Sequence, residues 1–127
     1  MRRRGIALDT SALSQFLDGA YEARVDDVAA LLSERRAYLS PVVATEVLSR
    51  PRLPEDLIQL VQSLPLLEIH DGYWYRAGLL RARVKRDRLK ANLADTLIAQ
   101  SCIDHDIPLI TYDRDFRHFV RAGLTLV

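Results

Sequence analysis

Acidic residues interrupt apolar stretches of this chain at four separate places. They are Asp9 after residues 5–8, Glu46 within 42–48, Asp95 within 93–99 and Asp113 after 109–112. A carboxylate in apolar surroundings loses its hydration, which is costly unless the group is paired, protonated or bound to a metal. Four scattered acids of this kind therefore suggest one shared cation.

Each acid also has an ordinary explanation when it is taken alone. Asp9 directly precedes a predicted helix and could simply cap it. Glu46 shares a helix face with Val42 and Val43, four and three residues earlier, which predicts the core face, but it could be a solvent-facing residue. Asp113 could be a turn residue, since aspartate is common in turns. Asp95 is hardest to dismiss, because its neighbours on both sides and on its own helical stripe are apolar or small. These explanations would have to hold independently, whereas a shared site explains all four acids together.

The residue types at such a site indicate which ion it would take. Oxygen ligands without histidine or cysteine select hard cations, so Mg²⁺ or Mn²⁺ is favoured over zinc or copper. A divalent ion stabilises the charged forms of clustered carboxylates and can activate a water, which suits phosphodiester hydrolysis. The sequence leaves open whether one or two ions act. A zinc site has little support, because there is one cysteine, Cys102, and the histidines are far apart: His70, His105 and His118.

A basic segment is the candidate for holding a polyanionic substrate. Lysine and arginine contacts to phosphates give sequence-independent affinity, so this segment could guide a nucleic acid towards the acids. The alternative is a solvated helical face, since surface helices often carry such charge. The segment contains Arg81, Arg83, Lys85, Arg86, Arg88 and Lys90.

Three consecutive aromatic residues, Tyr73, Trp74 and Tyr75, precede the basic segment. They could stack exposed bases, as aromatic side chains do in single-strand binders. Packing in the core is the alternative, because a helix must bury at least one of three consecutive aromatic positions.

The elements that must position these residues alternate between short apolar runs and longer helical patterns. This order is typical of βαβ units around a mainly parallel sheet. Asp9 and Asp113 follow predicted strands, and ligands bind at the carboxyl edge of open parallel sheets. Strands are predicted at 6–9, 38–39, 66–69, 109–111 and 124–126, and helices at 11–17, 25–34, 42–49, 54–64, 73–87 and 93–105, the last capped by Asn92.

The bulk properties of the chain bound the answer further. Its 127 residues predict a single α/β domain over 1–127. The 18 basic and 17 acidic residues leave the net charge at +1, so any charge that attracts a partner must be local. No stretch approaches the roughly 20 apolar residues that span a bilayer. We therefore expect a soluble cytoplasmic protein.

Taken in order, the acidic motifs resemble those of the PIN-domain nucleases, in particular the VapC-type toxins of bacterial and archaeal toxin–antitoxin pairs. Each motif is weak singly, and the ordered set is specific. The resemblance runs across essentially the whole chain. It rests on Leu8-Asp9-Thr10-Ser11-Ala12-Leu13, Thr45-Glu46-Val47-Leu48, Ala94-Asp95-Thr96-Leu97-Ile98-Ala99 and Thr111-Tyr112-Asp113-Arg114-Asp115-Phe116.

The resemblance implies a three-layer α/β/α fold and a Mg²⁺- or Mn²⁺-dependent endoribonuclease. Ser11 matches the family's small hydroxyl residue near the metal, and Thr111 matches the hydroxyl residue before the last acid. Family members vary in which acid of the final segment contacts metal, so Asp113 comes first and Asp115 is an auxiliary. The implied catalytic residues are Asp9, Glu46, Asp95 and Asp113, and the implied metal ligands are Asp9, Asp95, Asp113 and Asp115.

The same resemblance implies two protein partners. One is a second copy of the chain, in a homodimer that brings two acidic pockets near one groove. The other is a small antitoxin whose C-terminal segment blocks that groove.

Two rival functions remain at the level of sequence. The first is a catalytically inactive PIN-like module that only binds RNA or protein, although a scaffold has no use for clustered repulsion. The second is aspartyl-phosphate chemistry of the haloacid-dehalogenase kind. That family pairs two aspartates two residues apart, whereas Asp9 is followed two positions later by Ser11.

Overall fold

A short parallel sheet forms the centre of the protein in a computed structural model, which describes residues 4–19 and 25–127. The strands are β1 (Ile6–Leu8), β2 (Ala37–Tyr38) and β3 (Leu109–Ile110), in the order β2-β1-β3. Ala7 of β1 lies opposite both Tyr38 and Leu109, so the first strand occupies the middle of the sheet. Because all the strands are parallel, the residues that follow β1 and β3 emerge at the same edge.

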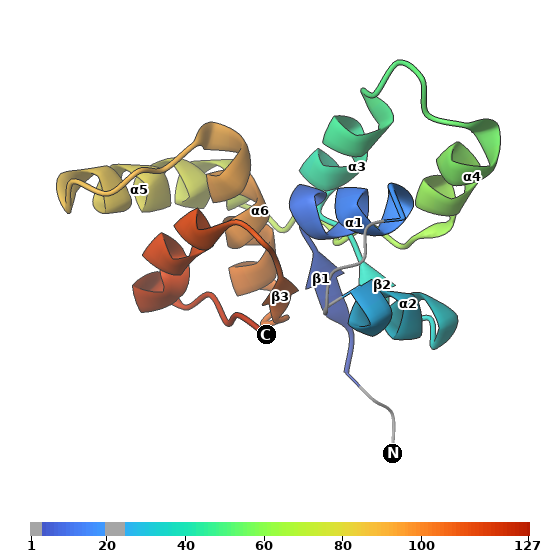
Figure 1. The fold of residues 1–127 in the computed structure, drawn as a ribbon. Helices are drawn as coiled ribbons and strands as arrows, with labels where there is room; N and C mark the ends of the chain where they lie inside the picture. The colour runs from blue at the N-terminus through green and yellow to red at the C-terminus, as the bar shows by residue number, and fades with distance from the viewer. Residues whose placement is uncertain (1–3, 20–24) are drawn as a thin grey trace.

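Helices cover the sheet on both sides and give the predicted three-layer α/β/α arrangement (Figure 1). In this view the helices of the first half lie on one side of the strands, and those of the second half on the other. The first group is α1 (Thr10–Leu17), α2 (Val25–Ser33), α3 (Pro41–Leu48) and α4 (Glu55–Ser63). The second is α5 (Tyr73–Arg86), α6 (Leu93–Asp104) and the 3₁₀ helix η1 (Arg114–Ala122).

The predicted helices are confirmed to within one or two residues at their ends. Their signals are local, because proline and the apolar spacing set most of the boundaries. Pro41 starts α3 in its first turn, and Asn92 occupies the N-cap position of α6. The Asn92 side chain makes no capping hydrogen bond, so it marks the helix start without satisfying its free N–H groups.

Two of the predicted strands are wrong in extent, and one helical segment was not predicted. The run 66–69 contributes only a bridge from Leu66 to Leu39, and 124–126 only a bridge from Leu126 to Leu109. Leu66 and Ile69 are exposed, so burial of these two side chains does not hold the run in the sheet. The 3₁₀ helix η1 ends at Gly123, whose φ of +118° turns the chain back towards Leu124. Phe116, Phe119 and Val120 do stand at helical spacing, so the sequence carried a signal for this segment, and Phe116 and Phe119 are its buried residues.

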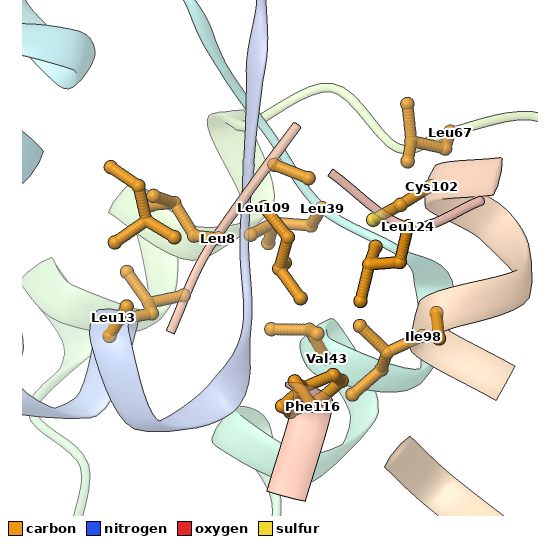
Figure 2. Close-up of a cluster of buried hydrophobic side chains, with 14 of the residues drawn as sticks. Leu8, Leu13, Leu39, Val43, Leu67, Ile98, Cys102, Leu109, Phe116 and Leu124 are labelled. Atoms are coloured by element: carbon orange, nitrogen blue, oxygen red, sulfur yellow. The ribbon is translucent and has the colours of Figure 1, made fainter. Parts of the chain in front are cut away.

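The hydrophobic core joins both halves of the chain. Leu8 of β1, Leu109 of β3, Ile98 of α6 and Phe116 of η1 are each at most 1% exposed. Figure 2 shows these side chains meeting around the sheet. Burial raises the pKa of the one thiol, Cys102, to about 12, so it packs here as a neutral group. The core thereby fixes α6 and η1, which carry two of the predicted acidic positions, against the strands.

Among the described residues, no helix is both long enough and apolar enough to cross a membrane.

Candidate active site

Asp9 occupies a buried position at the carboxyl end of the central strand, where it is 2% exposed. Its Oδ1 atom accepts hydrogen bonds from the Ala12 N–H and the Ser11 hydroxyl, both at 2.8 Å. Its Oδ2 atom accepts one from the Thr111 hydroxyl at 2.5 Å. Asp9 therefore does cap α1, as its alternative explanation predicted, and it also faces the end of β3.

Burial raises the pKa of Asp9 above its ordinary value. The hydrogen bonds from Thr111, Ala12 and Ser11 oppose this effect, and the nearby charge of Asp113 adds to it. The hydrogen-bond donors therefore partly offset the cost of burying this carboxylate.

The two hydroxyl residues tie the ends of β1 and β3 together. Ser11 Oγ lies 3.4 Å from Thr111 Oγ1 and accepts a hydrogen bond from the Tyr112 N–H at 3.1 Å. Thr111 Oγ1 also accepts from the Asp113 N–H at 2.9 Å. The predicted auxiliary residues Ser11 and Thr111 thus fix the backbone from which Asp113 projects.

Asp113 stands at the start of η1 in the role that its turn alternative predicted. Its Oδ1 atom accepts a hydrogen bond from the Asp115 N–H at 2.9 Å. Asp113 and Asp115 are both partly buried, so this segment brings two carboxylates to the edge of the sheet next to Asp9.

Glu46 lies on α3 at the border between the buried and exposed faces. The prediction that it shares the core face is wrong, because α3 buries Val43 and Val47 while Glu46 is exposed. Its Oε1 atom accepts a hydrogen bond from the Thr10 hydroxyl at 2.5 Å. Just beyond the ends of the two helices, Arg50 and Asp18 form an ion pair at 2.5 Å. These two links hold α3 against α1 and keep Glu46 beside Thr10, which directly follows Asp9.

Asp95 lies in the first turn of α6, on the stripe that also buries Ile98, Ala99 and Cys102. This confirms the prediction that it is not on the solvated side. Within the described chain its carboxylate accepts no hydrogen bond and forms no ion pair. Burial, followed by repulsion from other carboxylates, raises the pKa of Asp95 to about 6. In order of decreasing effect the repelling groups are Asp113, Asp9, Glu46 and Asp115.

The four predicted acids and Asp115 therefore converge, since every one of them acts electrostatically on Asp95. We refer to Asp9, Glu46, Asp95, Asp113 and Asp115 as the acidic cluster. Its members lie at the end of β1, on α3, on α6 and in the segment after β3, which are distant in sequence.

The acidic cluster fits a hard divalent cation in its chemistry, although it is not a ready-made cage. Among the described residues, no group of three or more histidine, cysteine, aspartate or glutamate side chains is arranged so that it could hold a metal ion. Mg²⁺ commonly takes only one or two carboxylates and completes its shell with waters and substrate oxygens. The Asp95 carboxylate, which has no partner in the described part of the chain and is repelled by four others, is the observation that fits such an ion.

The predicted basic segment does not form one continuous patch. Arg81 is used internally, because its Nε donates to the Ala91 carbonyl at 2.9 Å. Arg83 and Arg86 instead line a groove of about 350 Å³ between α5, α6 and the end of η1. Lys85 and Arg88 are exposed, and Lys90 pairs with Asp115 at 3.4 Å between Nζ and Oδ2. Of the six, Lys90 is the one that contacts the acidic cluster.

The three aromatic residues divide between the core and the surface. Tyr73 is 1% exposed, and its hydroxyl donates to the Leu97 carbonyl at 2.5 Å. Trp74 and Tyr75 are 61% and 82% exposed. Packing is therefore confirmed for Tyr73 alone.

Sequence reasoning missed two residues that organise the site. Thr10 holds Glu46, and His118 donates from Nδ1 to the Lys90 carbonyl at 2.8 Å. Thr10 follows Asp9 directly, which was a usable signal. Nothing in the sequence around His118 indicates that it approaches Lys90, because the two meet only when η1 packs beside the α5–α6 connection.

Comparison with known proteins gives a consistent picture. The family model described as PIN domain matches residues 6–122. No curated protein matches. A chain in the crystal structure of VapBC2 from Rickettsia felis, bound to a DNA fragment from their promoter, superposes with a TM-score of 0.71 at 18% identity, covering 96% of each chain.

Other solved structures share this fold at similar distance. A chain of DNA-bound VapBC from Salmonella typhimurium gives a TM-score of 0.71 at 19% identity, covering 98% of each chain. A chain of FitAcB from Neisseria gonorrhoeae gives 0.68 at 19% identity, covering 95% of each.

Proposed function

This chain belongs to the PIN domain family, and from that membership we propose that it is a Mg²⁺- or Mn²⁺-dependent endoribonuclease, the toxin of a VapBC-type toxin–antitoxin pair. The observation that carries the proposal is the convergence of four carboxylates on Asp95, which has no hydrogen-bond or ion-pair partner among the described residues. Repulsion of this kind lowers stability unless a cation is bound, so a purely structural domain gains nothing from it.

Asp95, Asp113 and Asp9 would hold the metal, and Asp115 stands at the edge of this group. The ion, when bound, supplies positive charge to a phosphodiester and lowers the pKa of a water. The hydrogen bonds from Ser11 and Thr111 hold the Asp9 carboxylate in one orientation. Such preorganisation is how a site favours the charge that develops in the transition state.

Glu46 is suited to a different part of the reaction. Its carboxylate is exposed and is held at one oxygen by Thr10, which leaves the other able to accept a proton. We assign it to orienting the attacking water or taking the proton that this water loses.

Cleavage of structured RNA tests the proposed activity. The protein should cut RNA with Mg²⁺ or Mn²⁺, and both EDTA and Asp95→Asn should abolish cutting. Cleavage that survives both treatments would indicate a contaminant or another mechanism. RNA binding without cleavage, under every metal condition, would instead support the inactive binding module.

Two protein partners form part of the proposal. The structural neighbours named above are VapBC and FitAcB complexes, which supports an antitoxin that occludes the acidic cluster. A homodimer is supported by exposed apolar groups on α5, where Leu79 is 71% exposed beside Tyr75, because large exposed apolar patches mark interaction sites. Light scattering of the purified chain should give twice the 14.5 kDa of one copy. We place the protein in the cytoplasm, where RNA and such a partner would be met.

Co-expression tests the antitoxin. A short reading frame beside this gene should encode a DNA-binding protein that co-purifies with the chain and inhibits RNA cleavage. A neighbouring protein that binds without inhibiting would contradict occlusion of the acidic cluster.

A further inference from the structure

Lys90 forms an ion pair with the acidic cluster, with Nζ 3.4 Å from Asp115 Oδ2. In the part of the chain that the structure describes, the other ion pairs join acids outside the cluster, such as Arg50 with Asp18 and Arg76 with Asp104. Lys90 is therefore the one described basic side chain paired with a member of the cluster.

The backbone of Lys90 is fixed as well as its side chain. His118 donates to the Lys90 carbonyl at 2.8 Å, while Arg81 donates to the next carbonyl, that of Ala91, at 2.9 Å. Asp115 and His118 are three residues apart on η1, and residues at this spacing lie on one face of a 3₁₀ helix. One face of η1 thus binds both the charge and the backbone of the same lysine.

Stability does not account for this arrangement. The Lys90 side chain is 64% exposed and that of Asp115 is 34% exposed, and exposed ion pairs contribute little to stability. The Lys90 ammonium has three donors, and its contact with Asp115 is an ion pair at 3.4 Å. Because the side chain is largely exposed, the ammonium group can bind a further oxygen at the border of a strongly acidic site.

A polyanion approaching this site meets several carboxylates, so a fixed positive charge at the border has a specific use. We propose that Lys90 binds a phosphate of the RNA beside the cleaved bond, and that Asp115 and His118 position it there. This inference rests on the proposed ribonuclease function. Asp115 then contributes to substrate binding indirectly, by positioning Lys90.

Kinetics with Lys90→Met test the contact. Losing one phosphate contact should raise KM by about tenfold and leave kcat within about threefold, since phosphate contacts position the substrate and carry affinity. Lys90→Arg, which keeps the charge, should recover most of the loss. The matched control is Arg117→Met, which removes one charge from the exposed side of η1 without touching the acidic cluster, and its KM should stay within about twofold.

Salt dependence provides a second readout. RNA binding is measured in EDTA, where no cleavage occurs, and Lys90→Met should lower the slope of log Kd against log salt by about 0.7 to 1. Arg117→Met should leave the slope unchanged. Equal slopes for the wild type and Lys90→Met, or equal losses in the two variants, would overturn the contact.

The positioning role of Asp115 is tested by combining variants. Asp115→Asn should raise KM nearly as much as Lys90→Met. The KM of the double variant should be no higher than that of either single variant, because both changes break the same Lys90–Asp115 contact. Mn²⁺ affinity, measured by electron paramagnetic resonance, should change by less than about threefold in Asp115→Asn if Lys90 is its main partner. Additive losses, or a loss of Mn²⁺ binding, would overturn this role.

These outcomes separate the inference from the function on which it rests. A wild-type protein that fails to cut RNA with Mg²⁺ and Mn²⁺ refutes the proposed activity. An active wild type whose Lys90→Met variant is unchanged in KM and salt slope refutes only the inference.

Discussion

Asp9 and Asp95 occupy opposite kinds of environment within one site. Asp9, at the end of β1, accepts hydrogen bonds from Ala12, Ser11 and Thr111 and is almost fully buried. Asp95, at the start of α6, is partly buried and accepts none from the described residues. Burial raises the pKa of both groups, but donors offset the effect at Asp9 while four carboxylates enlarge it at Asp95.

The difference separates two ways in which a carboxylate can be kept in a protein. The Asp9 region stabilises the fold whether or not a ligand is present, because its acid completes a helix cap and joins two strands. The Asp95 region is stabilised only when something positive arrives. A functional acid is therefore better identified by missing partners than by burial alone.

The largest expected effect is on activity, where the two regions should behave alike. Asp9→Asn and Asp95→Asn should each lower kcat by about 10³-fold or more, because each removes a charge intended for the metal and the transition state. Single-turnover RNA cleavage at saturating Mn²⁺ measures this. A variant that keeps a tenth of the wild-type rate would remove its residue from the catalytic set.

The stability of the metal-free protein should differ between variants of the Asp9 region and variants of the Asp95 region. Asp9→Ala should lower the free energy of unfolding by about 2 kcal/mol, because it removes a cap and the acceptor for two partly buried hydroxyls. Asp95→Asn should raise the Tm, because it removes the repulsion between this carboxylate and the rest of the acidic cluster. The increase should be only a few degrees, since solvent screens the repulsion of a partly exposed group. Thermal melts in EDTA give both values. A comparable loss in the two variants would mean that Asp95 has a structural partner.

Thr111→Val sharpens the comparison on the Asp9 side. Valine keeps the shape but removes both the hydroxyl donated to Asp9 and the acceptor for the Asp113 N–H. We expect a loss of about 1 kcal/mol in stability. Cleavage should also slow about tenfold, because the geometry of Asp113 loosens. Urea unfolding measures the loss in stability, and cleavage assays measure the loss in rate. A change in stability alone would limit Thr111 to a structural role.

The pH dependence of stability should be the smallest effect. The pKa of Asp95 is about 6 in the folded protein and 3.8 without the fold, so the folded state holds its proton more tightly between these values. The stability that Asp95 contributes is fully present below pH 3.8 and is lost as the pH rises through about 6. Unfolding of metal-free protein at pH 5 and 7.5 should show this loss in the wild type relative to Asp95→Asn. Parallel profiles would contradict the elevated pKa.

The sequence by itself determined the helices, the parallel α/β class and the identity of the acids. These features are local: apolar spacing defines a helix face, proline marks its start, and an acid within an apolar run is visible without coordinates. The same local signals could not give the extent of the two strands that reduce to bridges, since pairing depends on what lies alongside.

Only the tertiary structure decided which acids are satisfied and which are not. Asp9 and Asp95 look equally misplaced in the sequence, but the donors of Asp9 include Thr111, 102 residues away. Glu46 moved from the predicted core face to an exposed border, and Lys90 was selected from six basic residues by its contact with Asp115. Hydrogen bonds and charge repulsion act through space over a few ångströms, so folding alone brings the groups within range of one another.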